Sequence, residues 1–76
     1  HAHHLDSNHH VNNGQYVAIA AEYLPGGFQV RQLRAEYKRQ ARLGDILTPG
    51  ISESSGAYVV TLNDQAGRPY VILEFS

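Results

Sequence analysis

Residues 15–24 are the most informative stretch of this sequence, because a helix built from them would be apolar on nearly every side. Gln15 and Glu22 are the only polar residues among them, and three of the other eight are alanine, which favours a helix. A helix without a polar face is normally enclosed by other elements. The stretch therefore predicts a buried helix that other parts of the fold wrap.

Residue types suited to helix ends flank this stretch. Asn12 or Asn13 can accept a hydrogen bond from a free backbone N–H at the helix start. Pro25-Gly26-Gly27 cannot continue a helix and is typical of a stop. We therefore place the helix at residues 13–24.

The remainder of the chain has the pattern of an antiparallel sheet. Residues 28–41 form one long extended segment, whose apolar side chains change from even to odd positions. A one-residue change of phase predicts a β-bulge near residues 31–32. Further strands are predicted at 46–54, interrupted by Pro49 and Gly50, at 57–63 and at 69–75, with Asp64-Gln65-Ala66-Gly67 as the last hairpin loop.

The expected fold is α+β, with one buried helix followed by about four antiparallel strands. A sheet curled around a central helix is the hotdog arrangement, and four strands are few to enclose a helix. We therefore expect residues 1–76 to be a single partial hotdog domain, with residues 1–4 flexible. The first residue is His1 and not Met, which suggests a piece of a longer protein. Such a piece would pair with a second hotdog domain or form a homodimer.

Composition excludes several kinds of chemistry. The 76 residues include no cysteine, which rules out disulfides, thiolate metal sites and a cysteine nucleophile. A formal net charge of −1 gives no general electrostatic reason to bind nucleic acid or membranes. The longest apolar stretch, nine residues interrupted by Glu22, cannot span a bilayer. We expect a cytoplasmic protein without a cofactor.

The first ten residues hold all five histidines, but three of them lie at the terminus without fixed geometry, so we assign no metal site. Asp6, Asn8 and His10 alternate, and alternate side chains of an extended backbone share one side. The helix start at Asn12, Asn13 and Gly14 adds free N–H groups that can hold an oxyanion. A carboxylate, an amide and an imidazole could therefore perform acid–base chemistry, or they could merely satisfy a tight turn.

Two motifs carry a resemblance to a known family. D-x-N-x-H-V-N-N at residues 6–13, followed by an apolar helix, resembles the C-terminal hotdog domain of acyl–acyl carrier protein thioesterases. Glu36-Tyr37-Lys38-Arg39-Gln40-Ala41 resembles the second motif of that family, and the spacing between the two motifs fits. The resemblance extends from Leu5 onward. It implies hydrolysis, in fatty acid biosynthesis, of the thioester that joins a fatty acyl chain to acyl carrier protein.

The resemblance also implies which residues act. The catalytic Asp, Asn, His and Glu of the family correspond to Asp6, Asn8, His10 and Glu36. His10 rather than His9 keeps the family spacing to the asparagines. Plant members carry a cysteine where this chain has Ala41, which fits carboxylate and imidazole chemistry here. The strand phase groups Glu36 with Arg34 and Lys38, away from the helix, unless a second bulge or an interface intervenes.

Five of the six cations lie between residues 31 and 42: Arg31, Arg34, Lys38, Arg39 and Arg42. Acyl carrier proteins are acidic, so this basic stripe could steer the carrier, although ordinary solvated strand charges are an equal alternative. Two other functions stay open. One is a hotdog thioesterase that acts on acyl-CoA, and the other is a non-catalytic module that binds acyl chains or mediates assembly.

Overall fold

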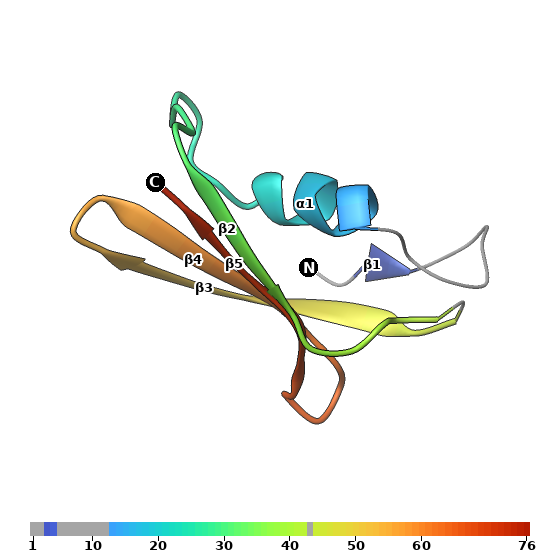
Figure 1. Cartoon of the computed structure of the whole chain (residues 1–76). Coiled ribbons are helices and arrows are strands. Elements are labelled where there is room, and N and C mark those ends of the chain that lie inside the picture. Colours follow the sequence, from blue (N-terminus) through green and yellow to red (C-terminus); the bar gives the residue numbers. More distant parts are fainter. Residues whose placement is uncertain (1–2, 5–12, 43) are drawn as a thin grey trace.

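The structure, a computed structural model, describes residues 3–4, 13–42 and 44–76. Its elements are β1 (His3–His4), α1 (Asn13–Ala21), β2 (Leu33–Tyr37), β3 (Ile46–Ser54), β4 (Ala57–Asn63) and β5 (Pro69–Phe75). The strands form one open antiparallel sheet in the order β1-β3-β4-β5-β2 (Figure 1). One helix followed by four antiparallel strands confirms the predicted α+β class and is consistent with part of a hotdog fold. The two-residue strand β1 was not anticipated.

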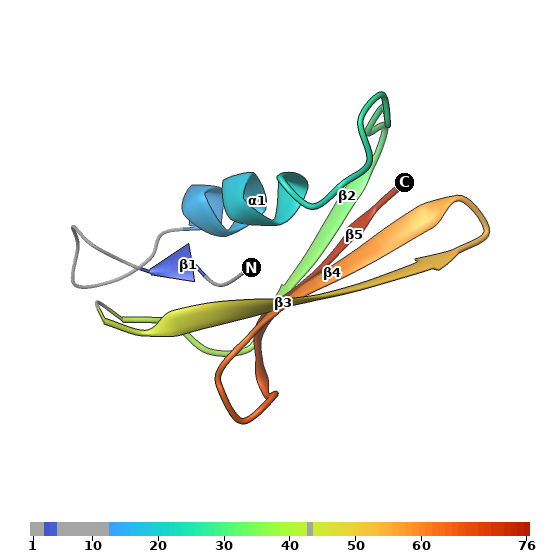
Figure 2. The same ribbon diagram turned by 180° about the vertical axis from the view of Figure 1, so that it is seen from behind.

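Helix α1 lies along one face of the sheet (Figure 2) and packs against β4 and β5. Tyr16 and Ala20, one helical turn apart, are its buried residues, whereas Ala18 and Ala21 are exposed. The prediction of a helix wrapped on nearly every side is therefore wrong. Alanine explains the difference, because its small side chain exposes little apolar area and can face water at low cost.

The helix also ends earlier than its sequence suggests. It stops at Ala21 rather than at residue 24, and the next three residues form a tighter turn. The N–H groups of residues 22, 23 and 24 each donate to the carbonyl three residues earlier, at 3.1–3.2 Å. A tightened last turn of this kind is a common way to satisfy free carbonyls before a proline such as Pro25.

The core lies between α1 and the facing side of the central strands. Alternate residues of β4 and β5 point into it, which gives the expected period of two. Its fully buried large side chains are Tyr16, Leu47, Val60, Leu62, Val71, Leu73 and Phe75. No helix in the described part of the chain is long and apolar enough to cross a membrane.

The long strand predicted at residues 28–41 is wrong in extent, because only Leu33–Tyr37 joins the sheet as β2. The predicted bulge near residues 31–32 is confirmed. The N–H groups of Arg31 and Gln32 both donate to the carbonyl of Ser76, at 2.7 and 2.9 Å, so two residues oppose one. A similar pattern at the other end of β2 joins Lys38 and Arg39 to one carbonyl of β5.

Strand β3 runs without interruption through Pro49 and Gly50, although the sequence suggested a break there. Among the described residues, β1 pairs with β3 only at Ile46 and Leu47, and β4 alone flanks the rest of the strand. Proline is tolerated on such an edge because no neighbouring strand needs its missing N–H. The hairpin between β4 and β5 forms as predicted, with Gly67 at a φ of 89°.

Candidate active site

A cleft of about 360 Å³ lies where the start of α1 faces the end of β2. One wall is formed by Asn13 and Tyr16 of the helix. The other wall is formed by residues 37–40, which are the central four residues of the second motif. The fold thus brings the second motif beside the helix into which the first motif leads.

Tyr16 joins the two walls of the cleft. Its hydroxyl accepts a hydrogen bond of 2.7 Å from the backbone N–H of Ala41 in a buried position. Its ring lies 6.0 Å from that of Tyr37, centroid to centroid. Burial raises the pKa of Tyr16 above its ordinary value of 10.0, so the hydroxyl keeps its proton near neutral pH.

Ala41, at the position where plant members carry a cysteine, is fully buried in the core. Its N–H is already used by Tyr16. The residue therefore serves packing in this chain.

Glu36 points away from α1, as its strand phase predicts. Ala35 and Tyr37 pair with the buried residues Leu73 and Val71, so Glu36, between them, occupies the opposite face of the sheet. Its side chain is 63% exposed, and its carboxylate lies 2.6 Å from the Lys38 ammonium. The bulge at residues 38–39 comes after Glu36 and leaves its direction unchanged.

The residues of the first motif divide between two groups. Asp6, Asn8, His10 and Asn12 lie outside the described residues. Asn13 and Gly14 are the first two residues of α1, and both are exposed. Within the described ranges, no group of three or more histidine, cysteine, aspartate or glutamate side chains is placed to hold a metal ion.

The five residues of the basic stripe are all exposed but have different surroundings. Lys38 is paired with Glu36, and Arg39 donates to the Asp64 carboxylate at 2.9 Å and to the Arg68 carbonyl at 3.1 Å. The backbone N–H of Arg42 donates to Asp45. Arg31 and Arg34 form no ion pair with the part of the chain that the structure describes. The Arg42 guanidinium likewise forms no ion pair with the described residues, so Arg31, Arg34 and Arg42 carry the guanidinium groups most available to a partner.

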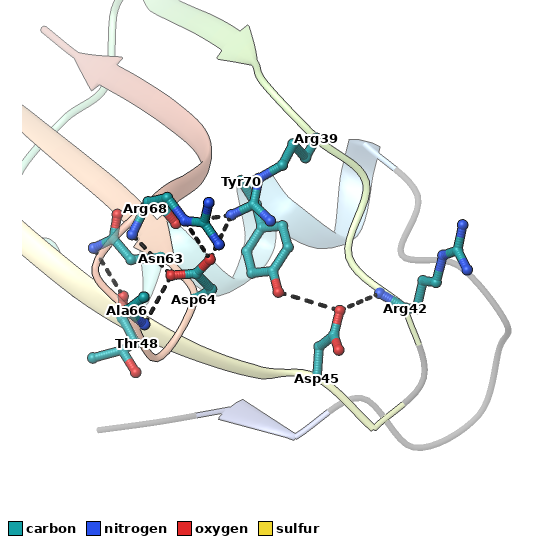
Figure 3. A network of polar contacts seen from close by, with 9 residues as sticks. All are labelled: Arg39, Arg42, Asp45, Thr48, Asn63, Asp64, Ala66, Arg68 and Tyr70. Atoms are coloured by element: carbon teal, nitrogen blue, oxygen red, sulfur yellow. Dashed lines mark hydrogen bonds and ion pairs between the residues drawn. The ribbon is translucent and has the colours of Figure 1, made fainter.

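A polar network beside the cleft was not anticipated from the sequence (Figure 3). Asp64, expected only as a loop residue, accepts hydrogen bonds from the backbone N–H groups of Ala66 and Arg68 and from the Arg39 side chain. Tyr70 and Asp45 complete the network through a hydrogen bond of 3.2 Å. The D-x-x-G pattern of the loop could have identified Asp64 as a turn residue, but no local pattern indicates its contact with Arg39, 25 residues away.

Asp64 is expected to make the stability of the hairpin sensitive to acid. The Arg68 N–H, followed by the Arg39 side chain, lowers the pKa of Asp64 below its ordinary value of 3.8. A lowered pKa contributes stability above pH 3.8 that is lost as the pH falls through the lower, folded value. Asp64→Asn should therefore melt below the wild type at pH 7, and the difference should shrink towards pH 2. A difference in melting temperature that does not change with pH would contradict this.

The comparisons with known proteins agree with the two motifs. The model of the family described as Acyl-ACP thioesterase C-terminal domain matches residues 2–72. No curated protein and no solved structure shows significant similarity to the chain. Because the match spans nearly the whole sequence and both motifs, the chain belongs to the acyl-ACP thioesterase C-terminal domain family.

Proposed function

We propose that this domain hydrolyses the thioester of fatty acyl–acyl carrier protein, releasing a free fatty acid and the carrier protein. The family implies thioesterase activity and acyl carrier protein as the substrate-bearing partner. The observation that carries the proposal is the cleft at the start of α1, because residues 37–40 of the second motif form one of its walls. Asn13, the last residue of the first motif, lines the opposite wall, so the cleft is the proposed place where a thioester meets groups from both motifs.

The first motif supplies the proposed chemistry. His10 precedes Asn13 by three residues, and three residues of extended chain span at most ~11 Å. In the proposed reaction, a water oxygen bonds to the thioester carbonyl carbon while Asp6 accepts the water proton. The C–S bond then breaks, and His10 gives a proton to the departing thiolate. Asn8 would hold the water or substrate by a hydrogen bond.

The negative oxygen of the tetrahedral intermediate needs hydrogen-bond donors. Free backbone N–H groups at the helix start, at Asn12, Asn13 and Gly14, are the proposed donors. Asn13 and Gly14 are exposed at the first turn of α1, so a substrate carbonyl can approach them. The positive end of the helix dipole adds to the stabilisation of that charge.

Glu36 has a different proposed role from Asp6. Its carboxylate faces away from α1 and binds the Lys38 ammonium, and Lys38 lines the cleft. We therefore assign the base to Asp6 and treat Glu36 as a positioning residue that acts through Lys38.

Hydrolysis assays on the full-length protein test the function. With the same acyl chain, we expect kcat/KM to be at least ~10-fold higher for the carrier-linked substrate than for acyl-CoA, because charge steering favours an acidic carrier. Equal rates would favour an acyl-CoA thioesterase. Absence of hydrolysis of both substrates would favour a non-catalytic binding module.

Removing two stripe charges is expected to weaken use of the carrier. Arg31→Gln/Arg34→Gln should raise KM for acyl carrier protein substrate more than for a small thioester, and the difference should shrink in high salt, since charges are screened over ~10 Å at 0.1 M. Arg39 is left unchanged because it belongs to the polar network. Ser52→Glu/Ser54→Glu, at exposed positions of β3, alters net charge equally and is the control. The same rise in KM in both variants would contradict carrier binding by the stripe.

The domain is also proposed to pair with a second hotdog domain or a second copy. Leu33 and Tyr37 of β2 pair with buried Phe75 and Val71 and so share the face that carries the core, yet both are exposed. Apolar side chains left uncovered on a core-bearing face favour burial against a partner.

A further inference from the structure

The chain that leaves β2 forms one wall of the cleft, and side chains and carbonyls outside its own strand hold it in place. The N–H groups of Lys38 and Arg39 both donate to the Tyr70 carbonyl, at 2.8 and 3.2 Å. The N–H of Arg42 donates to the Asp45 carboxylate at 2.8 Å. The conformation of this wall therefore depends on groups that do not themselves line the cleft.

Tyr70 contacts this wall in three ways. Its carbonyl accepts the two N–H groups just described, and its ring lies 4.4 Å below the Arg39 guanidinium, close enough for a cation–π contact. Its hydroxyl donates to Asp45 at 3.2 Å. Figure 3 shows the ring between Arg39 and Asp45. One nearly buried side chain thus joins both ends of the segment 39–45.

A local irregularity of the sheet accounts for the placement of Tyr70. Leu62 of β4 pairs with Val71, but Asn63 pairs with Pro69, so Tyr70 is an extra residue in β5. In a regular strand the side chains alternate between the two faces of the sheet. A bulge of this kind breaks the alternation and so changes the direction of a side chain. The second bulge, at residues 38–39, lies on the other side of β5, where both N–H groups meet the Tyr70 carbonyl.

Asp64 holds the tip of the Arg39 guanidinium. One carboxylate oxygen is held by the backbone of the hairpin loop, at Ala66 and Arg68, and the other accepts the Arg39 guanidinium at 2.9 Å. Arg39 is therefore held by a ring below it and a carboxylate at its tip. A guanidinium fixed in this way is poorly placed to reach a carrier protein.

From this arrangement we infer that Tyr70 and Asp64 are positioning residues of the candidate active site. They hold Arg39 and the backbone of residues 38–42, and so fix the cleft wall opposite α1. As far as turnover is concerned, the inference rests on the proposed function. Arg39, which the sequence suggested for carrier binding, is thereby assigned the role of holding the cleft wall.

Turnover by variants of the full-length protein is the first test. Arg39→Gln and Asp64→Asn should each lower kcat for carrier-linked substrate about 10-fold or more, with a smaller change in KM, because small misplacements of a site cost this much. Tyr70→Phe removes only the hydroxyl and should have a smaller effect. Arg39→Lys, which keeps the charge, should recover part of the loss.

Arg68→Gln is the matched control. The Arg68 side chain also approaches the Asp64 carboxylate, at 3.4 Å, but it is 76% exposed and does not line the cleft. Its loss should leave kcat within about twofold of wild type, because an exposed ion pair contributes little. An equal fall in kcat in Arg68→Gln and Arg39→Gln would overturn the inference, since general loss of hairpin charge would then explain both.

Hydrogen exchange supplies a readout that does not need activity. In Arg39→Gln and Asp64→Asn, the amides of residues 38, 39 and 42 should exchange faster, while those of β4 stay protected. Unchanged exchange at residues 38–42, or faster exchange with normal kcat, would overturn the inference. If the wild-type protein hydrolyses no thioester, the proposed function fails. The exchange measurement alone, extended to Tyr70→Phe for the amide of residue 42, then decides whether Tyr70 and Asp64 hold the wall.

Discussion

His10→Ala in the full-length protein is expected to lower kcat for acyl carrier protein thioester hydrolysis by ~10²–10⁴-fold, the usual loss when a general acid–base group is removed. His10 belongs to the motif that ends at the start of α1, where the structure places a cleft beside the second motif. An imidazole titrates near neutral pH and can therefore give the departing thiolate its proton. The thermal melting temperature should change little, because the effect is chemical.

The neighbouring imidazole is the matched control. His9→Ala removes the same side chain one position earlier, and we expect a much smaller loss of kcat. Asp6→Asn and Glu36→Gln extend the comparison in the same assay. The loss should be larger for Asp6, because Glu36 faces away from the helix and acts only through Lys38.

Three results would contradict this assignment. Unchanged hydrolysis by His10→Ala would exclude the imidazole as the acid. A larger loss in His9→Ala would move the role to His9. Near-normal kcat in both carboxylate variants would show that neither Asp6 nor Glu36 activates water, and the proposed scheme would fail.

The parts of the fold that depend on short-range patterns could be predicted from the sequence. The change of apolar phase after Val30 located a bulge, which the shared Ser76 carbonyl confirms. The D-x-x-G loop located the last hairpin, with Gly67 at positive φ. The outward direction of Glu36 also followed from strand alternation alone. These features are set by neighbouring residues, so the sequence contains the information directly.

Features that depend on distant residues could not be predicted. Arg39 looked like a surface charge suited to carrier binding, yet it is held by Asp64 and Tyr70, which are 25 and 31 positions away. The helix looked wrapped because its composition is apolar. Alanine, however, suits a buried and an exposed face equally well, and only the packing on β4 and β5 decides between them. The packing of residues distant in sequence therefore decides which side chains are buried and which charges are paired, and local composition does not.

The isolated 76-residue chain is expected to self-associate, and not to remain a stable, active monomer. Leu33, Tyr37 and Ile51 are 40%, 42% and 50% exposed, although each pairs with a buried core residue and so lies on the core-bearing face. A nine-residue helix is too short to cover β2 and the far half of β3. A small domain cannot bury these side chains without a partner.

The open edge of the sheet should also favour self-association. β2 is the last strand of the sheet in the described part of the chain, and all five of its residues are exposed. An edge strand presents unpaired backbone groups that can recruit a strand of another chain. Association through β2 would cover Leu33 and Tyr37 at the same time, so the apolar face and the edge favour the same contact.

Sedimentation equilibrium and thermal melting of the isolated chain measure this outcome. We expect a dimer or larger species with little thioesterase activity. Leu33→Ser, which removes an apolar side chain from the uncovered face of β2, should weaken the association. Ser52→Ala, at an exposed position of β3 on the other face of the sheet, should not. A monomer with a cooperative transition above ~45 °C, the low end for mesophile domains, would show that α1 and the sheet close this core unaided. The exposed side chains of β2 would then be an ordinary solvated surface.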